Sequence, residues 1–370
     1  MNIRPVILIL VLWSLSLSQA AAQRGPAFVS NEVHPDKTVT FRFRAPDAKD
    51  VKLSTRIIAE TQQMTKDENG VWSVTIGPAE PDFYPYNFIV DGVQVMDPNK
   101  PEWYPNEHNL KSMIQIPADS PQLYDIQDVP HGVVYYERYK TETGETRPLV
   151  IYTPPGYEEN KNKKYPVFYL ISGTTDTEET WYKAGKTNFI LDNLIARGKA
   201  VPMIVVMPYG NNNVDLSGQS GSVTETMYQA FQDDLLNNII PFVEDEYRTL
   251  TDREHRAIAG FSRGGGQTLW SGLRNPDLFA YVFSYSAYIA DDVFEKDFKV
   301  VHGDVDLTND RLKLFWLTVG YDDRLYDDVI EFIDLLNEKK INHETFFIPG
   351  GHTWMSTKKF LGESVPLLFK

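Results

Sequence analysis

The sequence predicts an α/β protein in which a mostly parallel β-sheet, covered by helices, follows a small all-β sandwich. Two observations predict this division. Between residues 28 and 116, short stretches of alternating apolar and polar residues are separated by turn sequences such as Asn69-Gly70 and Asp91-Gly92. From residue 124 onward, strand-like runs that are apolar throughout alternate with amphipathic helical segments, which indicates strands buried on both faces.

The length of 370 residues allows two domains, and a hydrophobic content of 42% is enough to form their cores. We predict the sandwich domain over residues 23–120 and the α/β domain over residues 121–370, with a turn-rich linker over 117–121.

Residues 1–22 are predicted to be a signal peptide rather than part of a domain. Arg4 supplies a positive start, an apolar run follows, and Ala20-Ala21-Ala22 gives the small residues of a cleavage site before Gln23. The mature protein is then exported, to the periplasm or the outside of the cell, without a membrane segment. An uncleaved anchor is the alternative.

Charge and residue usage narrow the partners and cofactors. The net charge of -15 argues against nucleic acid and anionic membranes, and is compatible with a neutral polysaccharide or a small ester. The absence of cysteine excludes disulfides, thiolate metal sites and a cysteine-linked lipid anchor. Neither a zinc-protease motif nor a glycine-rich phosphate loop is found, so we expect no metal and no cofactor. The oligomeric state stays open.

In the predicted α/β domain, an antiparallel pair over 132–139 and 147–153 comes first. Helical periodicity is clearest over 227–247 and 328–339. Further strands are predicted over 167–171, 203–207, 257–259, 282–284, 314–319 and 345–348.

The strongest chemical signal is the run Gly260-Phe261-Ser262-Arg263-Gly264, which follows a short apolar strand and opens a helix. This context is typical of a nucleophile elbow, in which a strained turn projects the serine hydroxyl from the sheet. The glycines on either side of Ser262 let the chain pass close to its neighbours. A glycine-rich packing turn is the structural alternative.

A serine needs a base to remove its proton, and His352 is the best candidate among seven histidines. It follows the last predicted strand on a Pro-Gly-Gly loop, from which it can reach the elbow. The acid of such a triad is expected between serine and histidine in sequence. Asp322 and Asp323 both follow the strand 314–319, and the spacing alone does not choose between them.

An oxyanion hole requires two backbone amides held in place before the reaction. We predict the amide of Arg263, directly after the serine, and the amide of Thr174 in the loop after the strand 167–171. A simple strand-to-helix turn is the alternative for that loop.

From about Tyr124 onward the chain resembles the esterase D-like α/β-hydrolases of carbohydrate esterase family one, which include feruloyl and acetyl-xylan esterases. The resemblance rests on the elbow and on the runs 152–157, 165–170, 205–208 and 350–354. It implies an α/β-hydrolase fold, and the family's Gly-x-x-Asp pattern favours Asp323 as the acid. The region before it resembles the immunoglobulin-like early-set domain related to carbohydrate-binding module family 48, on the runs 44–46, 69–72, 86–92 and 97–98.

Three departures from the family bear on the substrate. Ser172-Gly173 stands where His-Gly is usual, and residues 355–357 lack a second tryptophan. Arg263 replaces a methionine beside the nucleophile. Its guanidinium is expected to pair with a carboxylate or to contact the substrate, and we favour the carboxylate.

The resemblance implies a secreted serine esterase that releases ferulate from plant cell-wall xylan. Acetyl xylan and a siderophore or other small ester are alternative substrates, and a carbohydrate-binding protein with an inactive hydrolase domain is the non-enzymatic alternative. Trp181, Tyr209 and Trp354 are candidates for substrate contact, whereas core packing is favoured for Trp270. Aromatic residues of the sandwich either bind sugar or pack against the α/β domain; they are Tyr84, Tyr86, Trp103 and Tyr104.

Overall fold

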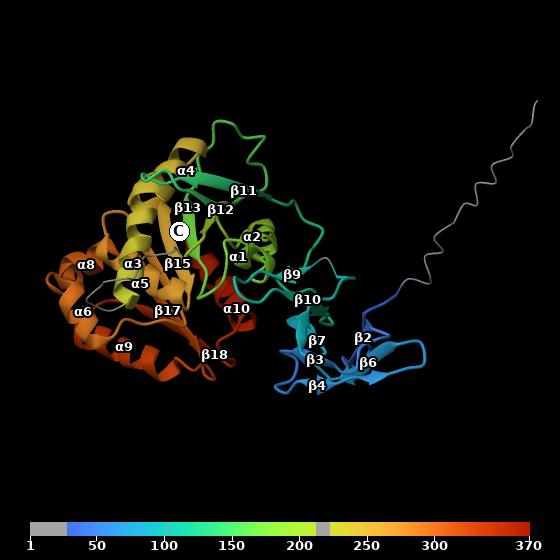
Figure 1. Ribbon diagram of the computed structural model, residues 1–370. Helices are drawn as coiled ribbons and strands as arrows, with labels where there is room; N and C mark the ends of the chain where they lie inside the picture. The colour runs from blue at the N-terminus through green and yellow to red at the C-terminus, as the bar shows by residue number, and fades with distance from the viewer. Residues whose placement is uncertain (1–27, 101, 212–222) are drawn as a thin grey trace, which may run out of the picture.

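The computed structural model describes residues 28–100, 102–211 and 223–370 (Figure 1). The predicted signal peptide and its cleavage site at Gln23 lie outside the described residues. Within these ranges no helix is long and apolar enough to cross a membrane.

The described residues from 28 to 116, called the β module below, form two antiparallel sheets. One has the order β1-β2-β6-β5, and the other has the order β4-β3-β7-β10-β9, with β8 paired to β7. Apolar residues that alternate along the strands, such as Phe41, Leu53 and Phe88, fill the space between the sheets. The predicted sandwich is therefore confirmed. Its strands are β1 (Asn31–Val33), β2 (Val39–Arg44), β3 (Val51–Thr55), β4 (Gln62–Gln63), β5 (Thr65–Lys66), β6 (Val71–Ile76), β7 (Asp82–Val90), β8 (Val93–Val95), β9 (Trp103–Tyr104) and β10 (Lys111–Ile116).

The rest of the chain, called the α/β module, is built on an eight-stranded sheet with the order β11-β12-β14-β13-β15-β16-β17-β18. The first two strands are antiparallel, and the other six run parallel to one another. This confirms the predicted mostly parallel sheet, with each predicted strand in place. The strands are β11 (Val133–Lys140), β12 (Thr146–Thr153), β13 (Val167–Ile171), β14 (Ile204–Pro208), β15 (Arg256–Phe261), β16 (Tyr281–Tyr285), β17 (Leu314–Gly320) and β18 (Glu344–Ile348).

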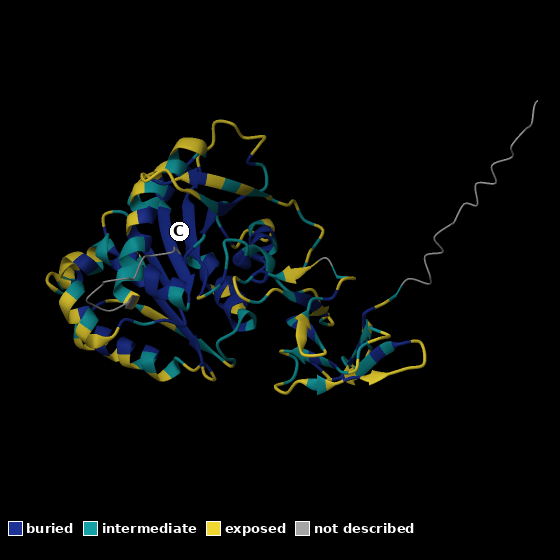
Figure 2. Cartoon of the chain, in the orientation of Figure 1, coloured by how far each residue is buried: buried dark blue, intermediate teal, exposed yellow. Residues whose placement is uncertain are grey.

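Helices cover both faces of this sheet, so its central strands are dark blue in Figure 2, whereas the edge strands β11 and β18 and the outer sides of the helices carry exposed residues. Side chains alternate along β13: Tyr169 packs on the face covered by α3, α4, α5 and α9, and Phe168 on the face covered by α1, α2 and α10. The helical segments are α1 (Thr180–Lys183), α2 (Thr187–Ala196), α3 (Val223–Asp234), η1 (Leu235–Ile239), α4 (Ile240–Glu246), η2 (Arg253–His255), α5 (Arg263–Arg274), α6 (Asp291–Asp297), α7 (Lys299–His302), α8 (Val305–Arg311), α9 (Tyr326–Glu338), α10 (Trp354–Ser364) and η3 (Val365–Leu367).

The two modules meet through buried polar contacts. Lys358 of α10 forms an ion pair with Asp82 at the start of β7, and both side chains are buried. Tyr104 of β9 donates a hydrogen bond of 2.7 Å to Asp176, in the loop after β13. Such contacts hold the β module against the carboxyl ends of the parallel strands, where the predicted catalytic residues lie.

Candidate active site

Ser262 sits at a sharp turn between β15 and α5. Its φ of 56° and ψ of -120° are strained for a residue with a side chain, and the turn points the hydroxyl away from the sheet. A Cβ atom on Gly260 would lie 2.2 Å from the carbonyl oxygen of Gly264, and one on Gly264 would lie 2.4 Å from that of Ile171. Only glycine fits at both positions, so the glycine spacing in the sequence is a requirement of this turn.

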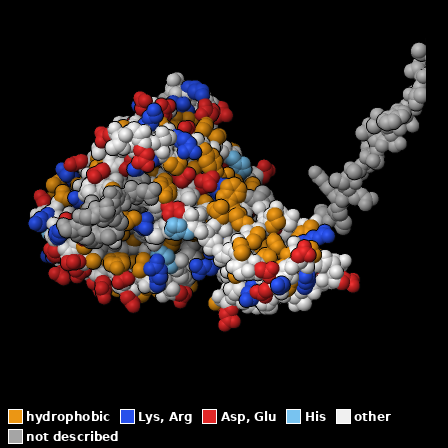
Figure 3. All heavy atoms as spheres, in the orientation of Figure 1, with side chains coloured by type: hydrophobic (Ala, Val, Ile, Leu, Met, Phe, Trp, Pro, Cys, Tyr) orange, Lys and Arg blue, Asp and Glu red, His pale blue; other side chains and the backbone are white. Residues whose placement is uncertain are grey.

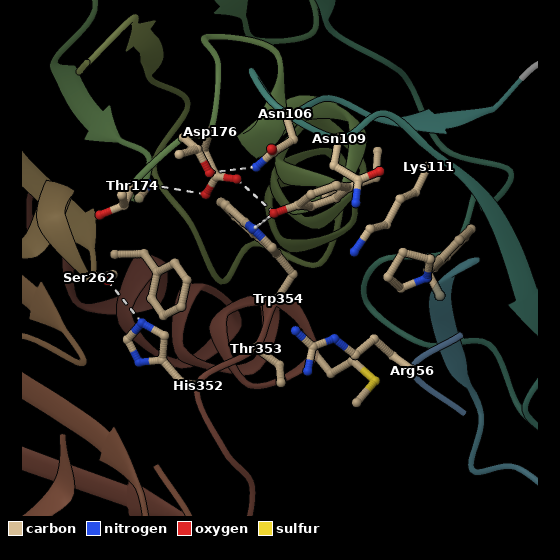
Figure 4. A pocket seen from close by; sticks show the side chains of 18 of the residues that line it. Arg56, Asn106, Asn109, Lys111, Thr174, Asp176, Ser262, His352, Thr353 and Trp354 are labelled. Carbon is tan, nitrogen blue, oxygen red and sulfur yellow. Dashed lines mark hydrogen bonds between the residues drawn. The ribbon is translucent and has the colours of Figure 1, made fainter. Parts of the chain in front are cut away.

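His352 lies between β18 and α10 and reaches the serine. Its Nε2 is 2.9 Å from the Oγ of Ser262, the contact drawn as a dashed line in Figure 4. The imidazole packs against the ring of Phe261, with 4.7 Å between the ring centroids. Directly after it, the hydroxyl of Thr353 caps α10 by accepting from the amide of Ser356. Packing on one side and the capped helix on the other thus fix the position of the ring.

Asp323 completes the arrangement from the loop after β17. Both of its carboxylate oxygens are 2.9 Å from the Nδ1 of His352, and the amide of Leu325 also donates to it. Burial alone would raise the pKa of Asp323, but the hydrogen bonds from His352 and Leu325 outweigh burial and hold this pKa below its usual value. The carboxylate is therefore ionised at neutral pH. Asp322 instead accepts from the amide of Gly350 and is exposed.

The loop after β13 brings Thr174 beside Ser262, and both residues line the same cavities. Asp176 accepts from the amide of Gly173, and the side chain of Asn211 donates to the carbonyl oxygens of Gly173 and Asp176 at 3.3 and 2.7 Å. These bonds fix the loop on both sides of Thr174.

The guanidinium of Arg263 donates to the side-chain oxygen of Asn211, a neutral amide. Among the described residues, the observed partner of Arg263 is thus an amide and not the carboxylate that was favoured. Through Asn211, the residue after the nucleophile is linked to the loop that carries Thr174.

Two cavities open at Ser262. The first, called the inter-module cavity, has a volume of about 280 Å³ and lies between the two modules; Tyr104, Ser262, His352 and Trp354 are in its wall. The second, called the helix-side cavity, has a volume of about 580 Å³ and is lined mainly by apolar and aromatic side chains, including Met227, Tyr228, Tyr288, Ile289, Val293 and Leu325. An ester carbonyl at Ser262 can thus place one of its two substituents in each cavity.

The three aromatic residues predicted to contact substrate have different positions. Trp354 lines the inter-module cavity, and its indole nitrogen donates to the hydroxyl of Tyr104. Trp181 is only 1% exposed and packs beneath Trp354, so a direct substrate contact for Trp181 is wrong. Tyr209 is outside the walls of both cavities and donates to Glu107 of the β module. Trp270 is buried in the core, as favoured.

The aromatic residues of the β module do not form one exposed platform. Tyr84 and Tyr86 are buried in the core of the sandwich. Tyr104 is directed into the junction, and Trp103 is covered on one face by the ammonium group of Lys183 at 3.1 Å from the ring centroid. Packing is thus observed for Tyr84, Tyr86 and Tyr104, whereas Trp103 stays 37% exposed.

Sequence reasoning missed the residues that the β module contributes to the site. Arg56 and Lys111 line the inter-module cavity, although they are about 150 to 210 positions before Ser262 in the chain. It also missed Asp176 and Asn211, whose signal is only the position of a polar residue in a loop after a buried strand. In the described ranges no cluster of three or more histidine and acidic side chains could hold a metal ion.

The comparisons with known proteins agree with this geometry. The family described as "Putative esterase" matches residues 141–356, which is more than half of the chain and includes Ser262, Asp323 and His352. This chain belongs to that esterase family. The esterase is 35% identical over 278 residues to an endo-1,4-beta-xylanase/feruloyl esterase of Xylanibacter ruminicola, a match that covers 73% of this chain and 38% of the relative. The esterase thus spans well under half of the length of that relative.

Two solved structures extend the comparison. The feruloyl esterase module from Clostridium thermocellum is 26% identical with a TM-score of 0.56, and the match covers 68% of this chain and 92% of that one. The enterobactin esterase from Shigella flexneri is 17% identical with a TM-score of 0.61, over 90% of this chain and 93% of that one. The first supports the esterase reaction class, and the second shows that the fold likeness includes the β module. The esterase is therefore a carboxylic ester hydrolase with an α/β-hydrolase fold.

Proposed function

We propose that this esterase is exported and releases hydroxycinnamates such as ferulate from plant cell-wall xylan, with Ser262, His352 and Asp323 as its catalytic triad. The observation that carries the mechanism is the position of His352, which lies 2.9 Å from both the serine hydroxyl and the aspartate carboxylate. This is the contact pattern that nucleophilic catalysis by serine requires.

In the acylation step, Nε2 of His352 takes the proton of Ser262 as Oγ bonds to the ester carbon. The carbonyl oxygen becomes an oxyanion, which the amides of Thr174 and Arg263 stabilise. His352 then gives its proton to the leaving alcohol, and the carbon–oxygen bond to that alcohol breaks. In the second step His352 deprotonates a water molecule, which attacks the acyl-enzyme and releases the acid and the free serine. Asp323 orients the imidazole and stabilises its charged form throughout.

The choice of a hydroxycinnamate is supported by the relatives and by the helix-side cavity. A xylanase/feruloyl esterase and a feruloyl esterase module are among the similar proteins. The aromatic and apolar wall of the helix-side cavity, with Tyr228 and Tyr288, suits a planar phenolic ring.

The triad is tested with Ser262→Ala, which should lower kcat on methyl ferulate by about 10⁶-fold, as in a comparable triad. Ser120→Ala, at an exposed serine away from the site, is the matched control and should keep the activity. Near-normal hydrolysis of methyl ferulate and 4-nitrophenyl acetate by Ser262→Ala would overturn the triad.

The substrate is tested by the products that the native enzyme releases. Ferulate should be released from feruloylated arabinoxylan faster than acetate from acetyl xylan or acid from a catecholate trilactone. A reversed order would replace the hydroxycinnamate by one of those two substrates and leave the triad intact. Binding to xylan without turnover of any ester would instead indicate a carbohydrate-binding protein.

Export is checked by N-terminal sequencing of the secreted chain, which should begin at Gln23.

A further inference from the structure

Three cationic side chains surround the inter-module cavity. Arg56 and Lys111 come from the β module, and Arg324 follows Asp323 in the α/β module. Figure 4 shows Arg56 and Lys111 directed into the cavity opposite Ser262 and His352. Among the described residues none of the three has a carboxylate partner. Arg56 and Arg324 are exposed and Lys111 is partly buried, and Arg324 also lines the helix-side cavity. In a protein of net charge -15, Arg56 and Lys111 are thus the two cations that line the inter-module cavity alone.

The fold holds Arg56 and Lys111 near each other in spite of their like charges. Arg56 follows β3 and Lys111 begins β10, and both strands pair with β7. Burial, and then the positive charge of Arg56, lower the pKa of Lys111. An anion placed between the two side chains would offset both the burial and the like-charge repulsion.

The protein supplies little negative charge of its own here. Asp176 is the one carboxylate in the described cavity wall, and it is buried and already accepts from Tyr104 and Gly173. Asn109 adds a neutral donor beside Lys111: its oxygen accepts from Asn87 at 3.1 Å, which leaves its amide nitrogen for the cavity (Figure 4). Two cations and an amide donor are suited to a carboxylate.

The reaction places the alcohol side of the ester in this cavity. His352 must protonate the leaving oxygen, so that oxygen has to lie on the side of the imidazole. His352 is in the wall of the inter-module cavity, whereas the described wall of the helix-side cavity contains Ser262 and Arg263 but not His352. The acyl group then occupies the helix-side cavity, and the sugar meets Arg56 and Lys111.

We propose that the inter-module cavity selects esters whose sugar portion carries a carboxylate, a uronic acid, and that Arg56 and Lys111 bind this group. The inference rests on the proposed function, because it uses His352 as the acid that protonates the leaving group. The β module is thus a specificity-determining part of the active site.

The test uses two substrates that differ only in the carboxylate: the feruloyl esters of methyl glucoside and of methyl glucuronoside. The native enzyme should show a higher kcat/KM on the glucuronoside, and 0.5 M salt should reduce this preference because salt screens partly exposed charges. In the double variant Arg56→Gln/Lys111→Gln the ratio of the two kcat/KM values should fall by about tenfold. Lys49→Gln, at an exposed lysine of the same module outside the cavity wall, should keep the native ratio.

Each result has a distinct meaning. Equal kcat/KM values for the two substrates in the native enzyme, or a ratio that the double variant leaves unchanged, would overturn the carboxylate site. If the double variant does not fold, the native enzyme alone tests the proposal: a preference for the glucuronoside that 0.5 M salt does not reduce would overturn the carboxylate site. Failure of the triad is seen separately, as hydrolysis of methyl ferulate by Ser262→Ala.

Discussion

The two walls of the site at Ser262 are built in different ways. Ser262, Asp323 and His352 follow β15, β17 and β18, three parallel strands of one sheet, so the register of the sheet brings their loops together. The opposite wall comes from a separate sandwich, which is held in place by side chains at the junction. Figure 3 shows the smaller β module against the side of the larger α/β module. Under the proposed mechanism, the residues that break the ester bond thus belong to one module, whereas the surroundings of the leaving group depend on how the second module docks.

The largest loss of activity is expected on replacing Asp323, the predicted acid of the triad, which lies in the wall built by the α/β module. Asp323→Asn should lower kcat by about 10⁴-fold, because an amide stabilises neither the correct tautomer of His352 nor its charged form. Asp322→Asn is the matched control: its carboxylate accepts only from a loop amide among the contacts seen here, so the loss should be small. Steady-state kinetics on methyl ferulate measure both variants, and a severe loss in Asp322→Asn alone would reverse the assignment.

The next effect concerns the docking of the β module. Lys358→Met leaves the buried Asp82 without its cation and should lower the free energy of unfolding by about 3–5 kcal/mol in chemical denaturation. Lys359→Met, one residue further at an exposed position, is the control and should cost little. The double variant Lys358→Met/Asp82→Asn should recover part of the loss, because no buried charge then stays unpaired. Equal stability of Lys358→Met and Lys359→Met would show that the junction does not depend on this pair.

A smaller, pH-dependent effect is expected at Asp176, where the two walls touch. Burial raises the pKa of Asp176 to about 6, although Tyr104 and Gly173 donate to it. The folded state therefore binds this proton more tightly than the unfolded chain, whose pKa is about 3.9. The protonated carboxyl of Asp176 therefore adds to the free energy of unfolding below about pH 4, and this contribution is lost as the pH rises through about 6.

Denaturation of the native enzyme and Asp176→Asn at several pH values measures this linkage. The stability of the native enzyme relative to the variant should fall by on the order of 3 kcal/mol between pH 4 and pH 7. A difference that stays constant or grows over that range would contradict the raised pKa.

The parallel sheet and the positions of the predicted triad residues could be read from the sequence because their signals are local. The strand before Ser262, the glycines beside it and the turn after it are within about ten residues, and the same holds for the strands before Asp323 and His352. The choice of Asp323 over Asp322 needed the family pattern, since two adjacent aspartates have the same spacing. In the structure only Asp323 contacts the imidazole.

The other wall could not be read in this way. Arg56 and Lys111 look like ordinary surface cations of strand ends, and only the docking of the sandwich brings them to Ser262. The prediction for Trp181 was wrong because its place in the sequence does not show that Trp354, more than 170 residues later, packs on it and buries it. Contacts between residues that are far apart in the sequence leave no local periodicity or spacing from which they could be predicted.

The chain of hydrogen bonds from Trp354 through Tyr104 to Asp176 has a consequence for how such proteins can evolve. A β module moved in from another protein would need a tyrosine where Tyr104 stands and a carboxylate where Asp82 stands. Without them, Asp176 and Lys358 would be buried with partners missing. Recombination that exchanges the sandwich alone would therefore damage the enzyme, and the two modules are expected to be inherited as a unit.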